Sequence, residues 1–326
     1  MPDIYTIILA EYTRQPMTSV TVYHKTVPNA KNPEKIDLLK NFSIGVQADG
    51  DILFDNHSYS YQPTDVGVIQ GWLGEGAITT PHLQLRNAVI TNQLKNKKYV
   101  VAVDSNLFLY ADTANTLHYL RYSFNGVFPN TGIYCDTIVD PSRWEKISRN
   151  LNISLKDYRT NGEHILICLQ RNGGWSMGKT DLQDWLVQTI ATIRQCSSRP
   201  IVIRPHPGDK ASKDLIRSGN PKCKVKFSKA VRLSNNENLV DDLRNCWAAV
   251  NYNSSPVVGA AIEGIPIFVC NPEKSQSREI ANTDLSQIEN PLLPDRQQWV
   301  ERLSMFHWNF DELKSGECWR HMRKFI

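Results

Sequence analysis

Short apolar runs alternate with amphipathic segments through the second half of this chain, and this alternation restricts the possible folds more than any other feature. The runs are "HILICLQ", "PIVIR", "WAAVNY" and "IPIFVC", and helical patterns lie near residues 180–196, 211–217, 237–246 and after Pro256. Strands that are apolar throughout are typical of parallel sheets covered by helices on both faces. The sequence therefore predicts a doubly wound α/β domain in this half.

The segment "TDLQDWLVQTIATIRQC" carries the clearest helical signal. Thr180 and Gln183 have the spacing of a capping box, which predicts the helix start. Its apolar residues fall on one helical face, and they are Leu182, Trp185, Leu186, Ile190 and Ile193. A further strand is predicted at "KVKFS".

The first half predicts a second α/β domain. Its strand-like runs are "IYTIIL", "SVTVYH", "FSIGVQ", "VGVIQGW" and "YVVAVD", and residues 82–94 read as a helix. Apolar periodicity is lost in "NISLKDYRTNGE", so we place the domains at 1–155 and 156–295. Residues 296–326 are predicted to be helical and to pack back on the first domain.

Length and composition exclude several classes of protein. A chain of 326 residues suits two domains. The seven cysteines are far apart, with no C-x-x-C pair, which is typical of reduced core residues in a cytoplasmic protein. No apolar stretch of about 18 residues predicts a membrane span. Sequence patterns of zinc proteases, P-loop ATPases and serine hydrolases are missing from the chain.

Three polar loops follow predicted strands of the second domain. They are "QRNGGWS" (170–176), "PHPGDK" with His206 between two prolines, and "NSS" (253–255) before Pro256. Ligands of parallel α/β sheets bind beyond the carboxyl ends of strands. Glycines, serines, Arg171 and a helix start are groups that suit a phosphate. Each loop also has a structural explanation, namely a flexible turn, a surface histidine or a helix cap, but their combination favours an anion site.

These phrases resemble a known fold family. "R-P-H-P", followed by "N-S-S" before a helix and by "E-G-I-P-I-F-V", is similar to the nucleotide-sugar domain of GT-B glycosyltransferases, in the branch with His-Pro and Ser-Ser motifs that includes bacterial sialyl- and Kdo-transferases. The resemblance implies two Rossmann-like domains facing across a cleft. It implies contacts to the donor phosphate from His206, Ser254 and Ser255. With the neighbouring loop residues, the expected donor site comprises Gln170, Arg171, Asn172, Gly173, Gly174, Trp175, Arg204, His206, Asn253, Ser254 and Ser255.

A second resemblance covers nearly the whole chain. "GVIQGWLGEG", "DSNLFLY", "YLRYSFNGVFPNTG" and "RPHPGD" look like a tailed-phage family associated with glycosylation of hydroxymethylated pyrimidines in DNA. This resemblance implies double-stranded DNA carrying 5-hydroxymethylcytosine as the acceptor, in the cytoplasm of an infected bacterium. The basic and aromatic residues Lys97, Lys98, Arg320 and Arg323 are then the candidates for phosphate contacts, with Trp72 on the acceptor side.

Transfer with inversion requires a base for the acceptor hydroxyl. Glu75 in "QGWLGEG" and Asp104 in "VVAVDSN" each end a predicted strand and are the rival candidates, while His206 is expected to stabilise the leaving phosphate. "ADGD" (48–51) matches a D-x-D metal motif but is interpreted as a tight turn. We therefore expect no metal or other cofactor, and a nucleotide-sugar as co-substrate.

Together with these resemblances, the sequence predicts a glycosyltransferase, with a UDP-sugar as the favoured donor and a CMP-sugar, which that branch often uses, as the alternative. Two alternatives stay open: an enzyme of bacterial surface polysaccharide, and a non-catalytic nucleotide-sugar or DNA-binding module.

Overall fold

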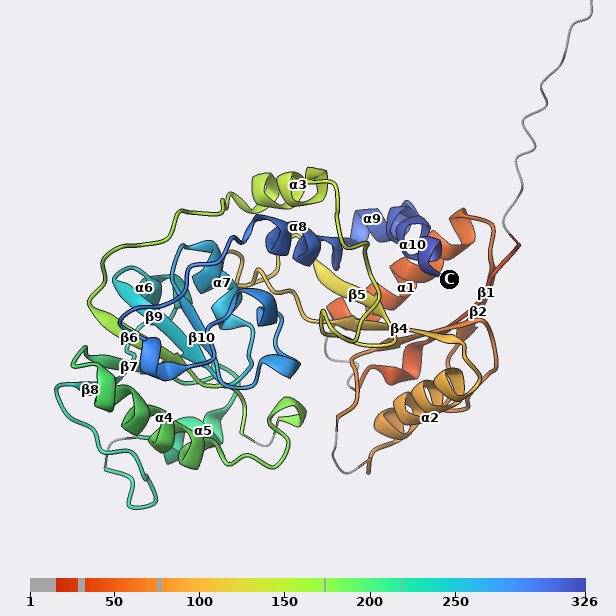
Figure 1. Cartoon of the computed structure of the whole chain (residues 1–326). Coiled ribbons are helices and arrows are strands. Elements are labelled where there is room, and N and C mark those ends of the chain that lie inside the picture. Colours follow the sequence, from red (N-terminus) through yellow and green to blue (C-terminus); the bar gives the residue numbers. More distant parts are fainter. Residues whose placement is uncertain (1–15, 29–32, 75–77, 173, 218) are drawn as a thin grey trace, which may run out of the picture.

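The computed structural model describes residues 16–28, 33–74, 78–172, 174–217 and 219–326. Two sheets, each flanked by helices, lie side by side (Figure 1). The strand predicted at residues 4–9 and the candidate base Glu75 lie outside the described residues. No helix within the described ranges is long and apolar enough to cross a membrane.

The first sheet has six strands in the order β11-β5-β4-β3-β1-β2. Its strands are β1 (Ser19–Tyr23), β2 (Ile52–Asn56), β3 (Val66–Gln70), β4 (Tyr99–Asp104), β5 (Leu120–Phe124) and β11 (His307–Trp308). Strands β1 to β4 run parallel, whereas β5 is antiparallel to β4 and β11 is antiparallel to β5. The predicted strands at "SVTVYH", "VGVIQGW" and "YVVAVD" are confirmed.

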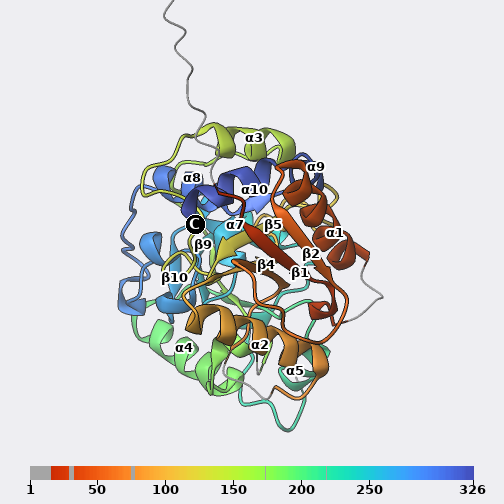
Figure 2. The same ribbon diagram turned by 90° about the vertical axis from the view of Figure 1, so that its right-hand side faces the viewer.

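Helices cover both faces of this sheet because side chains alternate between faces along each strand. Val20, Val22 and Val66 pack with α1 (Pro33–Ala48), whereas Tyr23 and Ile69 pack with α2 (Pro81–Lys95). Figure 2 shows α1 on one side of the sheet and α2 on the other. The helix predicted at 82–94 is therefore confirmed.

The second sheet is wholly parallel, in the order β10-β9-β6-β7-β8. Its strands are β6 (His164–Cys168), β7 (Ile201–Arg204), β8 (Val231–Leu233), β9 (Cys246–Asn251) and β10 (Ile267–Val269). Its helices are α4 (Leu182–Cys196), α5 (Lys210–Leu215), α6 (Leu239–Leu243) and α7 (Pro256–Ile262). Ile165 and Ile167 pack on the α4 side and Leu166 on the α7 side, which confirms the predicted doubly wound architecture.

The C-terminal segment returns to the first sheet. It comprises α8 (Gln297–Met305), strand β11, α9 (Phe310–Lys314) and α10 (Glu317–Met322). Leu313 and Trp319 of this segment share a core with Leu39 and Phe42 of α1. Helix α3 (Ser142–Leu151) lies before β6. Short 3-10 helices are η1 (His24–Thr26), η2 (Trp175–Met177), η3 (Pro272–Lys274), η4 (Arg278–Ile280), η5 (Leu285–Gln287) and η6 (Arg323–Phe325).

Two predicted strands are wrong. "FSIGVQ" belongs to α1, where Leu38, Leu39, Phe42 and Val46 are buried at helical spacing and Ile44 points outward, 48% exposed. The alternation of Phe42, Ile44 and Val46 imitates a strand only over this short window. "KVKFS" forms no strand either, and β8 begins at Val231 instead.

The start of α4 also differs from the prediction. Asp181, rather than Thr180, caps the helix, and its carboxylate accepts hydrogen bonds from the backbone N–H groups of Gln183 and Asp184, both at 3.0 Å. The Thr180 hydroxyl lies 3.0 Å from the Tyr252 hydroxyl instead. A carboxylate is an equally good N-cap acceptor, and the sequence "TD" offered both residues.

The carboxyl-end loops of the two sheets touch one another. The loop after β4 places Leu107, Phe108 and Tyr110 in the same core as Val257 and Val258 of α7. The contact is close, since a Cβ atom built on Gly259 lies 2.6 Å from Cγ of Tyr110. A larger residue at 259 would therefore force Tyr110 or α7 to shift, and the loop after β4 packs directly on α7.

Candidate functional site

The three predicted loops lie together at the carboxyl edge of the second sheet. They follow β6, β7 and β9, which are neighbours in that sheet. Gln170 joins two of the loops: its side-chain oxygen accepts from the backbone N–H of Asn253 at 3.3 Å, and its amide donates to the Ser176 hydroxyl at 3.1 Å. The Asn253 side chain donates to the Ser176 carbonyl at 2.9 Å. The loops after β6 and β9 are thus one connected surface.

Asp209 joins the loops after β6 and β7. Its carboxylate accepts from the Asn172 backbone N–H at 2.8 Å and from the Ser212 hydroxyl at 2.6 Å. Burial disfavours the ionised carboxylate, but the hydrogen bonds from Ser212 and Asn172 outweigh burial and hold the pKa of Asp209 below its usual range. Its negative charge is therefore stabilised by the backbone N–H groups of Asn172 and Ser212 and by the Ser212 hydroxyl.

His206 is half-buried in this surface, and its ring orientation is set by its own loop. The Gly208 backbone N–H donates to Nδ1 of His206 at 3.1 Å. A neutral imidazole has one protonated nitrogen, so this bond assigns the proton to Nε2. Burial, together with the positive charge of Arg171, lowers the pKa of His206. The neutral ring thus presents its Nε2–H as a hydrogen-bond donor.

Arg171 lies beside His206. A Cβ atom built on Gly208 would be 3.1 Å from Nη2 of Arg171, so the glycine leaves the space that the guanidinium uses. Arg171 is exposed to solvent. Gly174 closes the same loop with a backbone hydrogen bond to the Arg171 carbonyl at 3.1 Å, and Trp175 begins η2. Gly173 lies outside the described residues.

The two serines are not used as helix caps. Ser255 stands at the N-cap position of α7 without a side-chain hydrogen bond to the helix. The Ser254 hydroxyl accepts from the Asn251 side chain at 3.2 Å. The side-chain oxygens of Asn251 and Asn253 are buried and accept no hydrogen bond from any described residue. This loop therefore retains polar groups without a protein partner next to Gln170.

Arg204, another predicted donor residue, is bound through its side chain to other parts of the second domain. Its guanidinium forms an ion pair with the buried Asp242 at 2.6 Å and donates to the carbonyls of Asn236, Glu237 and Asn238. The resulting contacts bind the end of β7 to the loop before α6. The structure thus gives the guanidinium of Arg204 a role within the protein.

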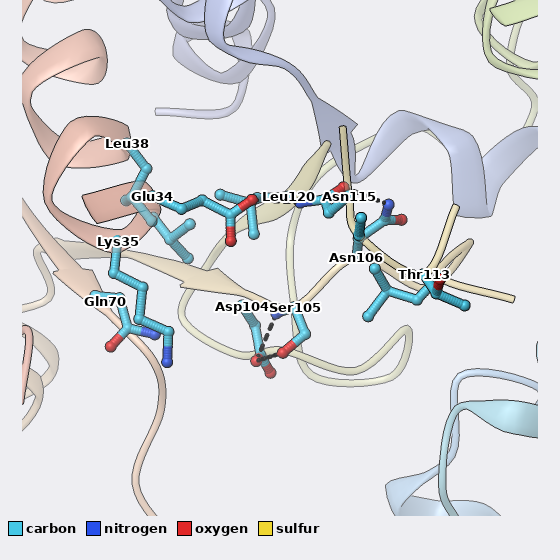
Figure 3. Close-up of a pocket in the computed structure, with 13 residues that line it drawn as sticks. Glu34, Lys35, Leu38, Gln70, Asp104, Ser105, Asn106, Thr113, Asn115 and Leu120 are labelled. Atoms are coloured by element: carbon cyan, nitrogen blue, oxygen red, sulfur yellow. Dashed lines mark hydrogen bonds between the residues drawn. The ribbon is translucent and has the colours of Figure 1, made fainter. Parts of the chain in front are cut away.

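A pocket of about 210 Å³ lies at the carboxyl edge of the first sheet (Figure 3). Asp104, one predicted base, lines it and is held on both oxygens: Oδ1 accepts from the Ser105 backbone N–H at 2.7 Å and Oδ2 from Arg121 at 3.0 Å. Glu34, which sequence reasoning missed, lines the same pocket and accepts from the Asn115 side chain at 2.7 Å. Trp72 is half-buried and packs with the core beneath α2.

A second group that sequence reasoning missed lies at the ends of β1 and β2. Nε2 of His24 is 2.7 Å from Oδ1 of Asp55, and the His24 ring stacks on His57 with centroids 4.3 Å apart. Burial lowers the pKa of His24 in spite of the bond to Asp55. Because the tip of the His24 ring is bound to Asp55, this pair reads as a structural contact. The position of His24 directly after β1 was the available sequence signal.

The predicted DNA-contacting residues lie at the opposite edge of the first sheet. Lys98 precedes β4 and pairs with Asp65 at 2.5 Å. Arg320 pairs with Asp49 at 2.6 Å and Arg323 with Asp51 at 3.0 Å, just before β2. Lys97 is exposed beside Lys98. Both acids of "ADGD" are thus engaged by α10 and η6, and these basic residues are separated from the carboxyl-edge loops by the length of the strands.

Comparison with known proteins shows the fold. The sequence matches no protein-family model and no curated protein. Among solved structures, the KpsC beta Kdo 2,4 transferase of Thermosulfurimonas dismutans has a TM-score of 0.50 at 9% identity, covering 91% of this chain and 98% of that chain. The beta Kdo 2,7 transferase of the same KpsC follows with a TM-score of 0.48 at 12% identity, covering 95% and 100%.

A third structure, the UDP-GlcNAc 2-epimerase of Methanocaldococcus jannaschii in complex with UDP-GlcNAc and UDP, has a TM-score of 0.36 at 14% identity, covering 94% and 99%. Among these three structures, the fold assignment rests on the KpsC beta Kdo 2,4 transferase, because its TM-score reaches 0.50 over nearly the whole of both chains. The two sheets with alternating helices and this likeness show that the chain has a GT-B-like fold of two α/β domains.

Proposed function

We propose that this protein is a glycosyltransferase that binds a nucleotide-sugar on the second domain and transfers the sugar to an acceptor held by the first. The observation that carries the proposal is the union of the loops after β6, β7 and β9 through Gln170, Asn253 and Asp209. These loops lie at the edge where parallel sheets bind ligands. The likeness to a Kdo transferase over 91% of the chain agrees with this assignment.

The proposed site is suited to a departing phosphate. Negative charge develops on the phosphate as the glycosidic bond breaks, and groups placed in advance around that position stabilise the transition state. His206 offers Nε2–H, because Nδ1 already accepts from Gly208. Arg171 adds a positive charge next to it, and Ser255 adds a hydroxyl that does not cap α7. A UDP-sugar is the favoured donor and a CMP-sugar the alternative.

We propose a saccharide as the acceptor. DNA carrying 5-hydroxymethylcytosine stays a prediction from the sequence, and the basic residues that motivated it are at the amino edge of the first sheet, where Lys98, Arg320 and Arg323 pair with aspartates. Phosphate contacts require basic groups on the surface that meets DNA. The solved structure with a TM-score of 0.50 is a beta Kdo 2,4 transferase. This likeness supports the alternative in which the enzyme acts on a bacterial surface polysaccharide.

The test is donor hydrolysis. The protein is incubated with a panel of UDP- and CMP-sugars, with and without EDTA, and free nucleotide and free sugar are measured. Slow hydrolysis of one donor supports the enzyme and excludes a non-catalytic binding module. Arg171→Gln is expected to reduce hydrolysis at least tenfold, whereas Arg149→Gln on the exposed face of α3 serves as the matched control. If no donor is bound or cleaved, the proposal fails.

A further inference from the structure

We propose that the pocket between α1 and the loop after β4 binds one sugar ring of the acceptor, and that Glu34 takes the proton from its reacting hydroxyl. This inference rests on the proposed function and specifies its acceptor side. Figure 3 shows Glu34 and Lys35 entering the pocket from α1, and Asp104 and Ser105 entering from the end of β4.

The lining of the pocket matches a polyhydroxylated ring. Two carboxylates and three amides line it, from Glu34, Asp104, Gln70, Asn106 and Asn115, and the amides of Asn106 and Asn115 are bonded to one another and to Glu34. Each sugar hydroxyl both donates and accepts, and amides and carboxylates provide the complementary groups. The pocket has a volume of about 210 Å³, within reach of one sugar ring but below the range of about 300–1,000 Å³ typical of drug-sized ligands. Apolar side chains complete the lining, and they are Leu38, Val103, Leu109, Ala114 and Leu120.

The hydrogen bonds distinguish the two carboxylates. Asp104 is bound on both oxygens, and its partner Arg121 is buried and also donates to the carbonyls of Ser105 and Val127. Glu34 uses Oε1 for Asn115, with Nδ1 of His118 at 3.2 Å from the same oxygen. Its other oxygen, Oε2, accepts no hydrogen bond from the described residues. Glu34 therefore has one oxygen without a protein partner among the described residues, whereas Asp104 is ion-paired with Arg121 and bonded on both oxygens, which makes it the weaker base.

Neighbouring amides fix the orientation of Glu34. Asn115 is buried in a left-handed backbone conformation with a φ of 51°. Its side-chain oxygen accepts from the Asn106 side chain at 2.9 Å, while its own NH₂ donates to Glu34. Asparagine adopts this conformation more readily than other residues with a side chain. Asn106 and Asn115 are thus positioning residues for Glu34.

The pocket is connected to the donor side through one loop. Leu109 lines the pocket, and the next residue, Tyr110, packs against Gly259 of α7. Helix α7 directly follows the loop that carries Ser254 and Ser255. One wall of the pocket therefore continues into a loop that rests on the helix beginning at the proposed phosphate site.

The proposed step is balanced. The acceptor hydroxyl oxygen forms a bond to the anomeric carbon of the donor sugar while the bond from that carbon to the phosphate oxygen breaks. The bonding electron pair leaves with the nucleotide phosphate, and the hydroxyl proton passes to Oε2 of Glu34. General-base catalysis of this kind contributes about 10²- to 10⁴-fold to a rate.

The first experiment separates transfer from donor chemistry. 4-Nitrophenyl glycosides are offered as acceptors, and transfer is measured by mass with the donor that the wild type hydrolyses. Glu34→Gln keeps the shape and the oxygen that accepts from Asn115, so we expect kcat for transfer to fall by about 10²-fold or more with donor KM unchanged. Glu145→Gln on the exposed face of α3 is the matched control. Wild-type transfer by Glu34→Gln overturns the role of Glu34 and leaves the proposed function standing.

The second experiment tests the pocket without catalysis. Binding of methyl glycosides is followed by saturation-transfer NMR. Ala114 is exposed at the rim of the pocket, so Ala114→Trp is expected to abolish the signal and Ala114→Ser to retain it, with the melting temperature as the folding control. Glycoside binding that persists in Ala114→Trp, or a wild type that binds no glycoside, overturns the pocket assignment. Failure of donor hydrolysis in the wild type overturns both proposals.

Discussion

The carboxyl edges of the two sheets carry different chemistry. At the second sheet, the acid Asp209 is enclosed by hydrogen bonds from its own loops, while Arg171, His206 and the serine loop face outward. At the first sheet, the acids Glu34 and Asp104 line an open pocket. One edge therefore suits a negatively charged group, and the other suits groups that give up protons.

This difference indicates how the work of a transfer reaction is divided. A leaving phosphate needs donors and positive charge, whereas an attacking hydroxyl needs an acceptor for its proton. Each sheet supplies one of the two environments, and the contact of Tyr110 with Gly259 keeps the edges together. The following predictions test this division, starting with the largest effect.

Removing the imidazole at the second edge should have the largest effect. His206→Ala is expected to reduce turnover by on the order of a hundredfold, as does the loss of a single donor that stabilises developing charge. Half-buried His206 makes few internal contacts, so the melting temperature should hardly change. Steady-state kinetics with the best donor, together with thermal unfolding, measures both. Unchanged turnover would contradict the assignment of this edge to the phosphate.

Asp104→Asn should lower the free energy of unfolding more than Glu34→Gln does, although both residues line the same pocket. The change leaves the guanidinium of Arg121, which is 7% exposed, without its counter-charge. Breaking a buried pair costs several kcal/mol, and the partial exposure of Asp104 lowers our expectation to about 2 kcal/mol. Urea unfolding should show this loss in Asp104→Asn and little loss in Glu34→Gln. Equal stabilities would mean that Asp104 is not a structural group.

Donor affinity should depend on pH through His206. Its pKa lies below 6.5 in the free protein because of burial and Arg171, and a bound phosphate raises that pKa. A pKa that rises on binding means that the added affinity is present at low pH and is lost as pH rises through the pKa of the complex. We expect affinity to increase by roughly threefold to tenfold from pH 8 to pH 5.5, tenfold corresponding to one pKa unit. Calorimetric titration of wild type and His206→Ala should show this slope in the wild type alone.

The smallest effect is expected at the amino edge of the first sheet. Replacing Lys97, Lys98, Arg320 and Arg323 together should leave glycosyl transfer to a saccharide within twofold of wild type. Three of the four side chains pair with aspartates at the amino edge, far from both carboxyl edges. The exposed pair of Lys98 with Asp65 contributes about 1 kcal/mol or less, and the loss of Arg323 from the buried Asp51 should lower stability more than it lowers transfer. If the quadruple variant instead loses binding to hydroxymethylated DNA and the wild type shows a steep salt dependence, DNA is the acceptor and our choice is wrong.

The second sheet was predictable from sequence because its signal is local. Continuous apolar strands, and loops with glycine, proline and serine directly after them, identify both the sheet and the edge that carries His206. The strand at "FSIGVQ" failed because a six-residue window does not distinguish a period of two from a helical face that includes Leu38 and Leu39.

The roles of residues at the carboxyl edge of the first sheet depend on contacts between residues that are far apart in the sequence. Glu34 is one acid in a polar helix start, and only the fold brings it to Asn115, 81 positions away. The same applies to the ion pair of Arg204 with Asp242, 38 positions away, which the sequence does not reveal. Pairing of Arg320 and Arg323 with Asp49 and Asp51 is equally invisible in sequence.

The central claim is that the two edges act separately on donor and acceptor. Calorimetric titration of wild type, His206→Ala and Glu34→Gln with the donor that the wild type hydrolyses tests it most directly. We predict that Glu34→Gln binds the donor with wild-type affinity and that His206→Ala binds it at least tenfold more weakly. Equal loss of donor affinity in both variants, or wild-type affinity in His206→Ala, would contradict the division.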